Sequence, residues 1–126
     1  MAKTAILIDD DRDDLQFLEE AIKKIDNSVK CIPYLYCDEA LSQISTATTA
    51  PPNYIFIDMN MPRLDGQQCL KELRKNPTFN QATITILSTF MPPVVAEKLK
   101  ENGADFTFQK PNKFDEYQYI LENIIQ

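Results

Sequence analysis

The sequence predicts an α/β fold in which helices cover both faces of a parallel sheet. Short, wholly apolar runs such as residues 5–8 and 54–57 alternate with segments whose apolar residues recur every three or four positions. The runs are typical of strands buried on both faces, and the spacing is typical of amphipathic helices. Five such strands alternating with five helices imply right-handed βαβ units and a doubly wound sheet.

The first strand, residues 5–8, stops at a run of acids, Asp9, Asp10 and Asp11. A helix is predicted next, because one helical face collects the apolar residues Leu15, Leu18, Ala21, Ile22 and Ile25. Asp13 and Asp14 fall in its first turn, where negative charge complements the helix dipole. We expect both to be solvated residues of a helix start.

The second strand is predicted over residues 31–37, and Pro33 within it indicates an edge strand, since proline cannot donate to a ladder. A short helix follows, with Asp38 as its expected N-cap and apolar residues at Ala40, Leu41 and Ile44. Residues 45–53 are rich in Thr, Ala and Pro and predict a loop.

The third strand, residues 54–57, again ends at an acid, Asp58. Residues 61–66 predict a turn in which Gly66 supplies a positive φ. A helix containing Cys69, Leu70 and Leu73 follows.

The fourth strand, residues 83–87, ends at the hydroxyls Ser88 and Thr89. A helix opens at Pro92-Pro93 and runs to about residue 102, with Gly103 as its stop. The last strand, residues 106–109, leads into Lys110-Pro111. The final helix carries Phe114, Tyr117, Leu121 and Ile124 on one face.

This pattern fits the flavodoxin-like strand order 2-1-3-4-5, which also places the proline-containing strand at an edge. Ligands of such sheets bind beyond the carboxyl ends of the first and third strands. Carboxylates gathered there repel one another, and a hard divalent cation relieves the repulsion. A site with few protein ligands suits Mg²⁺ better than Ca²⁺.

Composition excludes several classes. The 126 residues fit one domain, residues 1–126, and the net charge of −6 argues against nucleic-acid and anionic-lipid surfaces. No apolar run approaches the ~20 residues of a membrane span. Histidine is absent. Without a signal peptide, Cys31, Cys37 and Cys69 are expected to be reduced thiols in a cytoplasmic protein.

Residues 8–11, 57–66, 87–89 and 109–111 resemble, in order and spacing, the signature of response-regulator receiver domains. The stretch from Asp58 through Asn60-Met61-Pro62 to Asp65-Gly66 is specific by itself. The resemblance implies a receiver without an output domain, similar to the chemotaxis regulator. Such a module accepts a phosphoryl group from a sensor histidine kinase or a histidine phosphotransfer protein, and signals to a downstream protein partner rather than acting as an enzyme.

The resemblance assigns roles position by position. Asp58 matches the phosphoacceptor, Asp9 and Asp10 match the acids that hold Mg²⁺, and Asn60 matches the residue whose backbone carbonyl completes the metal site. These roles suit phosphoryl transfer, which requires an in-line nucleophile and positive charge for the transferred oxygens.

Two further positions match residues that contact the phosphoryl group. Ser88 matches the hydroxyl, and Lys110 matches the lysine, which in the family precedes a proline that is usually cis. Thr107 departs from the family, which usually has an aromatic switch residue there, so we expect the loop carrying Phe90 to act as the switch. Partners are expected to bind residues 92–120, with Tyr117, Gln118 and Tyr119 as candidate contacts.

Two alternatives remain. A pseudo-receiver would bind partners without phosphorylation, although such domains usually lose an acid or the lysine. A phosphatase of the haloacid-dehalogenase type would need an acid at position 60, where this chain has Asn60.

Overall fold

The computed structural model describes residues 3–46 and 51–125. The elements follow the predicted alternation of strands and helices, with one additional 3₁₀ turn, η1. In chain order they are β1 (Thr4–Ile8), α1 (Arg12–Ile25), β2 (Lys30–Tyr34), α2 (Cys37–Thr46), β3 (Tyr54–Asp58), α3 (Gly66–Arg74), η1 (Pro77–Phe79), β4 (Thr83–Ser88), α4 (Pro93–Glu101), β5 (Phe106–Gln109) and α5 (Phe114–Glu122).

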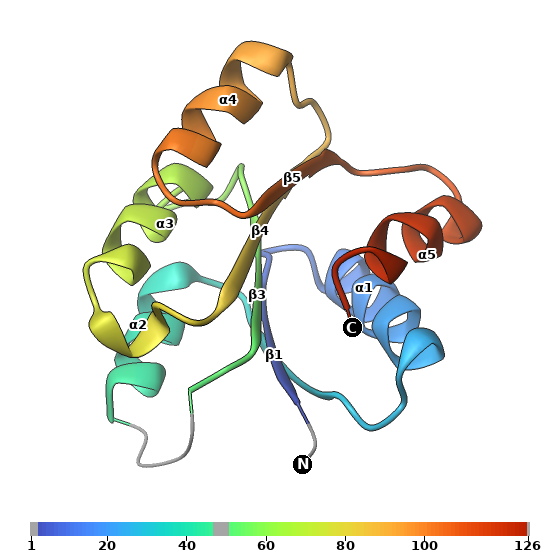
Figure 1. The fold of residues 1–126 in the computed structure, drawn as a ribbon, viewed down its shortest axis with the longest axis horizontal. Helices are drawn as coiled ribbons and strands as arrows, with labels where there is room; N and C mark the ends of the chain where they lie inside the picture. Colours follow the sequence, from blue (N-terminus) through green and yellow to red (C-terminus); the bar gives the residue numbers. More distant parts are fainter. Residues whose placement is uncertain (1–2, 47–50, 126) are drawn as a thin grey trace.

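The strands form one parallel sheet in the order β2-β1-β3-β4-β5, which confirms the predicted topology. Helices α1 and α5 cover one face, and α2, α3 and α4 cover the other (Figure 1). Strand β2, which contains Pro33, lies at an edge as predicted. Among the described residues, no helix combines the length and apolar character that crossing a membrane requires.

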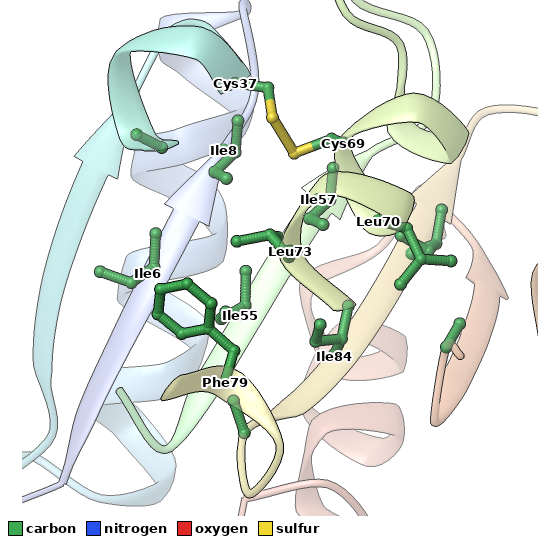
Figure 2. Packing of buried hydrophobic residues seen from close by; sticks show 14 of the residues in the cluster. Ile6, Ile8, Cys37, Ile55, Ile57, Cys69, Leu70, Leu73, Phe79 and Ile84 are labelled. Carbon is green, nitrogen blue, oxygen red and sulfur yellow. A yellow bond between two sulfur atoms is a disulfide. The ribbon is translucent and has the colours of Figure 1, made fainter. Parts of the chain in front are cut away.

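The central strands are buried on both faces because their side chains alternate between two cores. In β1 and β3, Ile6, Ile8, Ile55 and Ile57 pack under α2, α3 and η1 (Figure 2). Their neighbours Leu7 and Phe56 point the other way, toward α1 and α5. This two-sided burial explains why the predicted strands appear as continuous apolar runs.

The region around α2 differs from the prediction. Strand β2 ends at Tyr34, and Cys37 already begins α2. Asp38 lies in the first turn of α2 and does not cap it: its carboxylate pairs with Arg63 of the β3–α3 loop at 2.9 Å. Arg63 also stacks on the ring of Tyr36 at 3.9 Å, and it holds a left-handed φ of 69°. A long-range contact that the sequence does not reveal therefore replaces the local cap.

The predicted loop of residues 45–53 begins later than expected, because α2 continues to Thr46. Residues 47–50 of that prediction lie outside the described residues. The unpredicted turn η1 is capped by the side chain of Asn76, which accepts a hydrogen bond from the backbone of Thr78 at 3.0 Å.

The expectation that every cysteine is a free thiol is wrong for two of the three. Cys37 of α2 and Cys69 of α3 form a disulfide with their Cα atoms 5.9 Å apart, and Cys31 is free. The bond lies beside Ile8 and Ile57 in the core (Figure 2). The sequence separation of 32 residues says nothing about this proximity, which arises only when α2 and α3 pack side by side.

Arg74 at the end of α3 ties together segments that are distant in sequence. Its guanidinium donates to the carbonyls of Phe79, Ala82 and Gly103 at 2.8, 3.3 and 2.9 Å, and it pairs with Asp105 at 2.9 Å. Gly103, with φ 112°, ends α4 as predicted. A single side chain thus satisfies backbone carbonyls around the end of the sheet opposite the acidic residues.

Candidate functional site

Three carboxylates meet beyond the carboxyl ends of β1 and β3. Asp9 and Asp10 follow β1 directly, and Asp58 is the last residue of β3. One oxygen from each lies within 4.8 Å of the others. Asp9 and Asp58 are only 4% and 5% exposed, while Asp10 is exposed. Hard oxygen donors arranged in this way fit a divalent cation that keeps some of its water ligands.

Lys110 reaches into this cluster from the end of β5. Its ammonium lies 2.8 Å from Asp58 Oδ1, 2.9 Å from Asp9 Oδ2 and 2.8 Å from Asp14 Oδ2. The backbone N–H of Lys110 donates to the carbonyl of Ser88 at 2.7 Å and so fixes the start of the side chain. Residues 101 positions apart in sequence, Asp9 and Lys110, thereby come into direct contact.

The acids that follow Asp10 divide into different tasks. Asp11 is the N-cap of α1, because its side chain accepts hydrogen bonds from the backbone N–H groups of Asp13 and Asp14. Asp13 is exposed, as expected for a helix start. Asp14 also lies in the first turn, and its side chain is 41% exposed, but its carboxylate additionally pairs with Lys110. No local pattern could reveal this contact, because it joins the first helix to the residue that follows the last strand.

Asp9, Asp14 and Asp58 all contact the ammonium of Lys110, and these contacts affect the pKa values of the cluster. Burial lowers the pKa of Lys110, but hydrogen bonds to Asp14, Asp58 and Asp9 outweigh it and raise the pKa of Lys110 overall. Burial raises the pKa of Asp9 to about 6, against the lowering effects of the Asp11 N–H and Lys110. Burial also raises the pKa of Asp58, aided by the charges of Asp10 and Asp14. The carboxylates of the site therefore outnumber its one ammonium, and the site has a net negative charge when they are ionised.

This charge predicts an unusual dependence of stability on pH. The folded-state pKa of Asp9, about 6, lies above the ordinary value of 3.8, so the folded protein binds the proton more tightly than the unfolded chain does. Stability is then gained below the folded pKa and lost as the pH rises through it. Without divalent metal, the free energy of unfolding should increase as the pH falls from about 7.5 to about 5.

Asp9→Asn should flatten this dependence and raise stability at pH 7.5 by about 1 kcal/mol, because asparagine carries no charge to desolvate. Urea unfolding at both pH values measures the effect. Asp13→Asn, which changes an exposed acid four residues further along the chain, is the matched control. A protein that loses stability on acidification within this window, in parallel with the control, would contradict the prediction.

Ser88, at the end of β4, is buried beside the cluster and is held by two donors. The side-chain amide of Asn60 donates to its hydroxyl oxygen at 3.0 Å, and the backbone N–H of Phe90 does so at 3.3 Å. The sequence pointed only to the backbone carbonyl of Asn60, so its amide is a functional group that sequence reasoning missed. The described residues contain no cis peptide bond, so the Lys110–Pro111 bond is trans, unlike the usual family geometry.

Gly66, the first residue of α3, is needed for close approach and not for a positive φ. A Cβ at this position would lie 2.7 Å from the Cα of Met59 and 2.9 Å from the carbonyl oxygen of Asp58. The Gly66 N–H donates to the carbonyl of Met59 at 2.8 Å. The missing side chain thus lets α3 begin directly against the backbone that carries Asp58.

Gly66→Ala should therefore destabilise the fold by about 1–3 kcal/mol, the usual cost of an added methyl group that the backbone must move to accommodate. Thermal unfolding measures the loss. Gln67→Ala, one residue further along α3, is the control and should be nearly neutral. If the two variants are equally stable, the backbone around Gly66 accommodates the methyl group without loss of stability, and the prediction is wrong.

Successive side chains of strand β5 point to opposite sides of the sheet. Phe108 packs against Tyr117 with ring centroids 5.9 Å apart, on the face covered by α1 and α5. Thr107, on the opposite side of the strand, is partly buried. Phe90 is 72% exposed in the β4–α4 loop. Tyr117 is buried and is thereby removed from the expected partner contacts, whereas Tyr119 is exposed.

Comparison with known proteins agrees with this geometry. The family model of the response regulator receiver domain matches residues 5–122. Response regulator Rcp1 of Synechocystis is 29% identical over 91 residues, which cover 69% of this chain and 62% of Rcp1. The chain spans about half to three-fifths of the length of the first curated relatives that it matches.

Two solved structures show the same fold. The phosphorylated cyanobacterial phytochrome response regulator RcpA superposes with a TM-score of 0.86 at 20% identity, covering 98% of this chain and 91% of RcpA. The Mn²⁺-bound form of response regulator Rcp1 superposes with a TM-score of 0.80 at 21% identity, covering 97% and 91%. The fold and the acidic pocket define a receiver module of two-component signalling. The chain belongs to the response regulator receiver domain family.

Proposed function

We propose that residues 1–126 act as one receiver unit that takes a phosphoryl group on Asp58 with the help of Mg²⁺. The observation that carries the proposal is the Lys110 ammonium, which lies 2.8 Å from Asp58 and 2.9 Å from Asp9 at the edge of the acidic cluster. A buried nucleophilic carboxylate beside a fixed cation supplies two of the parts that phosphoryl transfer requires.

The metal supplies the remaining positive charge when it is bound, stabilising the charge that develops on the transferred oxygens. In the proposal Asp9, Asp10 and Asp58 hold it, together with the backbone carbonyl of Asn60. The proximity of the three carboxylate oxygens supports this set. The Mn²⁺-bound form of Rcp1 provides a divalent cation in a protein of the same fold. The choice of Mg²⁺ rests on the hard oxygen ligands and the exposure of Asp10 to water.

The other residues position the reacting group. Asp58 attacks the incoming phosphorus with a carboxylate oxygen, and the leaving group departs on the opposite side. The Lys110 ammonium, already at Asp58, donates to a phosphoryl oxygen, and the Ser88 hydroxyl donates to another after turning from its present partners. Because Asn60 and the Phe90 N–H both donate to Ser88, its movement is coupled to the β4–α4 loop.

The proposed phosphodonor is a sensor histidine kinase or a histidine phosphotransfer protein, because the chain belongs to the receiver family and has no histidine that could itself carry the phosphoryl group. The downstream protein partner is proposed to bind the surface of α4, β5 and α5. The exposed large apolar side chains of the described residues lie there or in the adjoining loop: Phe90, Val94, Phe106 and Tyr119. Exposed large apolar side chains on these elements support a protein-binding role for this surface.

A cytoplasmic location belongs to the same proposal. The Cys37–Cys69 disulfide removes the cysteine-based argument for a reducing compartment. The location therefore rests on the need for a kinase that uses ATP.

Intact mass spectrometry after incubation with acetyl phosphate tests the proposal. We expect the mass of one phosphoryl group to be added with Mg²⁺ and not with excess chelator. A protein that folds and binds Mg²⁺ but never gains this mass would instead be a pseudo-receiver, and the proposed function would be wrong.

A further inference from the structure

The Lys110 ammonium has three N–H donors and uses all of them on carboxylates. Its partners are Asp9, Asp58 and Asp14, at 2.9, 2.8 and 2.8 Å. Two of the three belong to the cluster of oxygens that can hold a cation, and Asp14 does not. Asp14 is therefore the one partner of Lys110 with no other task in the site.

This difference matters as soon as the site is used. A cation held by Asp9 and Asp58 would compete with Lys110 for their oxygens, and a phosphoryl group joined to one oxygen of Asp58 would remove the charge of the carboxylate that Lys110 contacts. The cation would change the contacts of Lys110 with Asp9 and Asp58, the phosphoryl group would change the contact with Asp58, and neither would engage Asp14. Lysine is a flexible side chain with costly rotamer entropy, so one fixed contact decides whether its ammonium stays in place.

The geometry of α1 keeps Asp14 in position for this. Asp11 caps the helix and accepts from the Asp14 N–H at 3.2 Å, which fixes the backbone of the first turn. Leu15, the next residue, is buried in the core between α1 and the sheet. The contact at 2.8 Å coexists with a Lys110–Asp58 contact of 2.8 Å, so Asp14 holds the ammonium at the phosphoacceptor and not away from it.

We infer that Asp14 is a positioning residue that keeps the Lys110 ammonium at Asp58 when cation and phosphoryl group engage its other two partners. The inference rests on the proposed function, since it assigns Asp14 a part in the same site. It separates Asp14 from Asp13, whose acid in the same helical turn is exposed and has the same favourable position in the helix dipole.

The test compares Asp14→Ala and Asp14→Asn with the matched variant Asp13→Ala in binding of beryllofluoride, a phosphoryl mimic, in the presence of Mg²⁺. Asp14→Ala should weaken the mimic roughly tenfold, the equivalent of about 1.4 kcal/mol. Asp14→Asn keeps an acceptor oxygen and should recover part of the affinity. Asp13→Ala should stay within about twofold of the wild type, since it loses only the helix-dipole contribution.

A second readout does not depend on phosphorylation. With Mg²⁺ alone, the ¹⁵N-labelled ammonium of Lys110 should give a slowly exchanging signal in the wild type and in Asp13→Ala, and lose it in Asp14→Ala. Thermal unfolding of each variant verifies that it is folded.

The outcomes separate the two proposals. A wild type that binds Mg²⁺ but neither beryllofluoride nor a phosphoryl group refutes the proposed function, and the Lys110 signal then decides the role of Asp14. If the wild type binds the mimic and Asp14→Ala binds it as tightly as Asp13→Ala does, or more tightly, the inference is overturned, and in the latter case Asp14 competes with the phosphoryl group for Lys110.

Discussion

Asp58→Asn is expected to abolish the Mg²⁺-dependent mass gain and, at the same time, to make the metal-free protein more stable at neutral pH. The amide lacks the nucleophilic carboxylate oxygen, and the neighbouring acids cannot take over. Asp9 already accepts from Lys110 and the Asp11 N–H, and Asp10 is exposed to solvent. The stability gain follows because burial raises the pKa of Asp58, so its charged form is costly in the folded state.

Asp65→Asn is the matched control for this experiment. Asp65 lies in the same segment and caps α3, a task that asparagine performs equally well. Intact mass after acetyl phosphate treatment and urea unfolding without metal should show wild-type behaviour for the control. An unchanged mass gain in Asp58→Asn would move the phosphoacceptor to another residue, and a loss of stability would show that the Lys110–Asp58 pair outweighs the cost of burying it.

Reduction of the Cys37–Cys69 disulfide is expected to lower the free energy of unfolding by about 3.5–4 kcal/mol. The bond closes a loop across a sequence separation of 32 residues. Without this constraint the unfolded chain has a higher entropy, which in the chain-entropy description lowers its free energy by that amount. For a domain of this size the urea midpoint should then fall by more than about 1 M. Urea unfolding with and without a reductant, after refolding in each condition, measures the shift.

The third cysteine supplies the controls. Cys31→Ala should keep the full sensitivity to reductant, because Cys31 is free. The double variant Cys37→Ala, Cys69→Ala should unfold at the same urea concentration with and without reductant. Mass spectrometry of the unreduced, alkylated wild type should find one modified cysteine. Three modified cysteines, or a midpoint that reductant does not move, would contradict the prediction.

The disulfide lies close to the residues that carry the acidic cluster. It packs beside Ile8 and Ile57, the residues directly before Asp9 and Asp58 (Figure 2). Arg63 of the β3–α3 loop forms a second link, because it contacts Tyr36 and Asp38 near the start of α2. The disulfide and the Arg63 contacts thus join α2 to the segment that follows β3, next to the acidic cluster. We expect these links to stabilise the backbone around Asp58.

The alternation of apolar runs and amphipathic segments determined the parallel sheet, its strand order and the edge position of Pro33, because each depends on patterns that a chain carries locally. The acids at the ends of β1 and β3 could be placed together for the same reason: parallel strands bring their carboxyl ends to one edge. The positions of Asp9, Asp10, Asp58, Ser88 and Lys110 at or just beyond strand ends therefore predict that they form one group.

Only the tertiary structure decided which of these groups touch. The Lys110–Asp14 contact, the Asn60–Ser88 hydrogen bond and the Cys37–Cys69 bond each join segments separated by at least 28 residues, so no local pattern contains them. Gly66 shows the same division. Its presence in the motif was plain, but its physical reason, a Cβ that would meet the backbone of Asp58 and Met59, exists only where α3 packs against the end of β3. Periodicity specifies which face of an element is buried, whereas the partner that each side chain meets depends on how the elements pack.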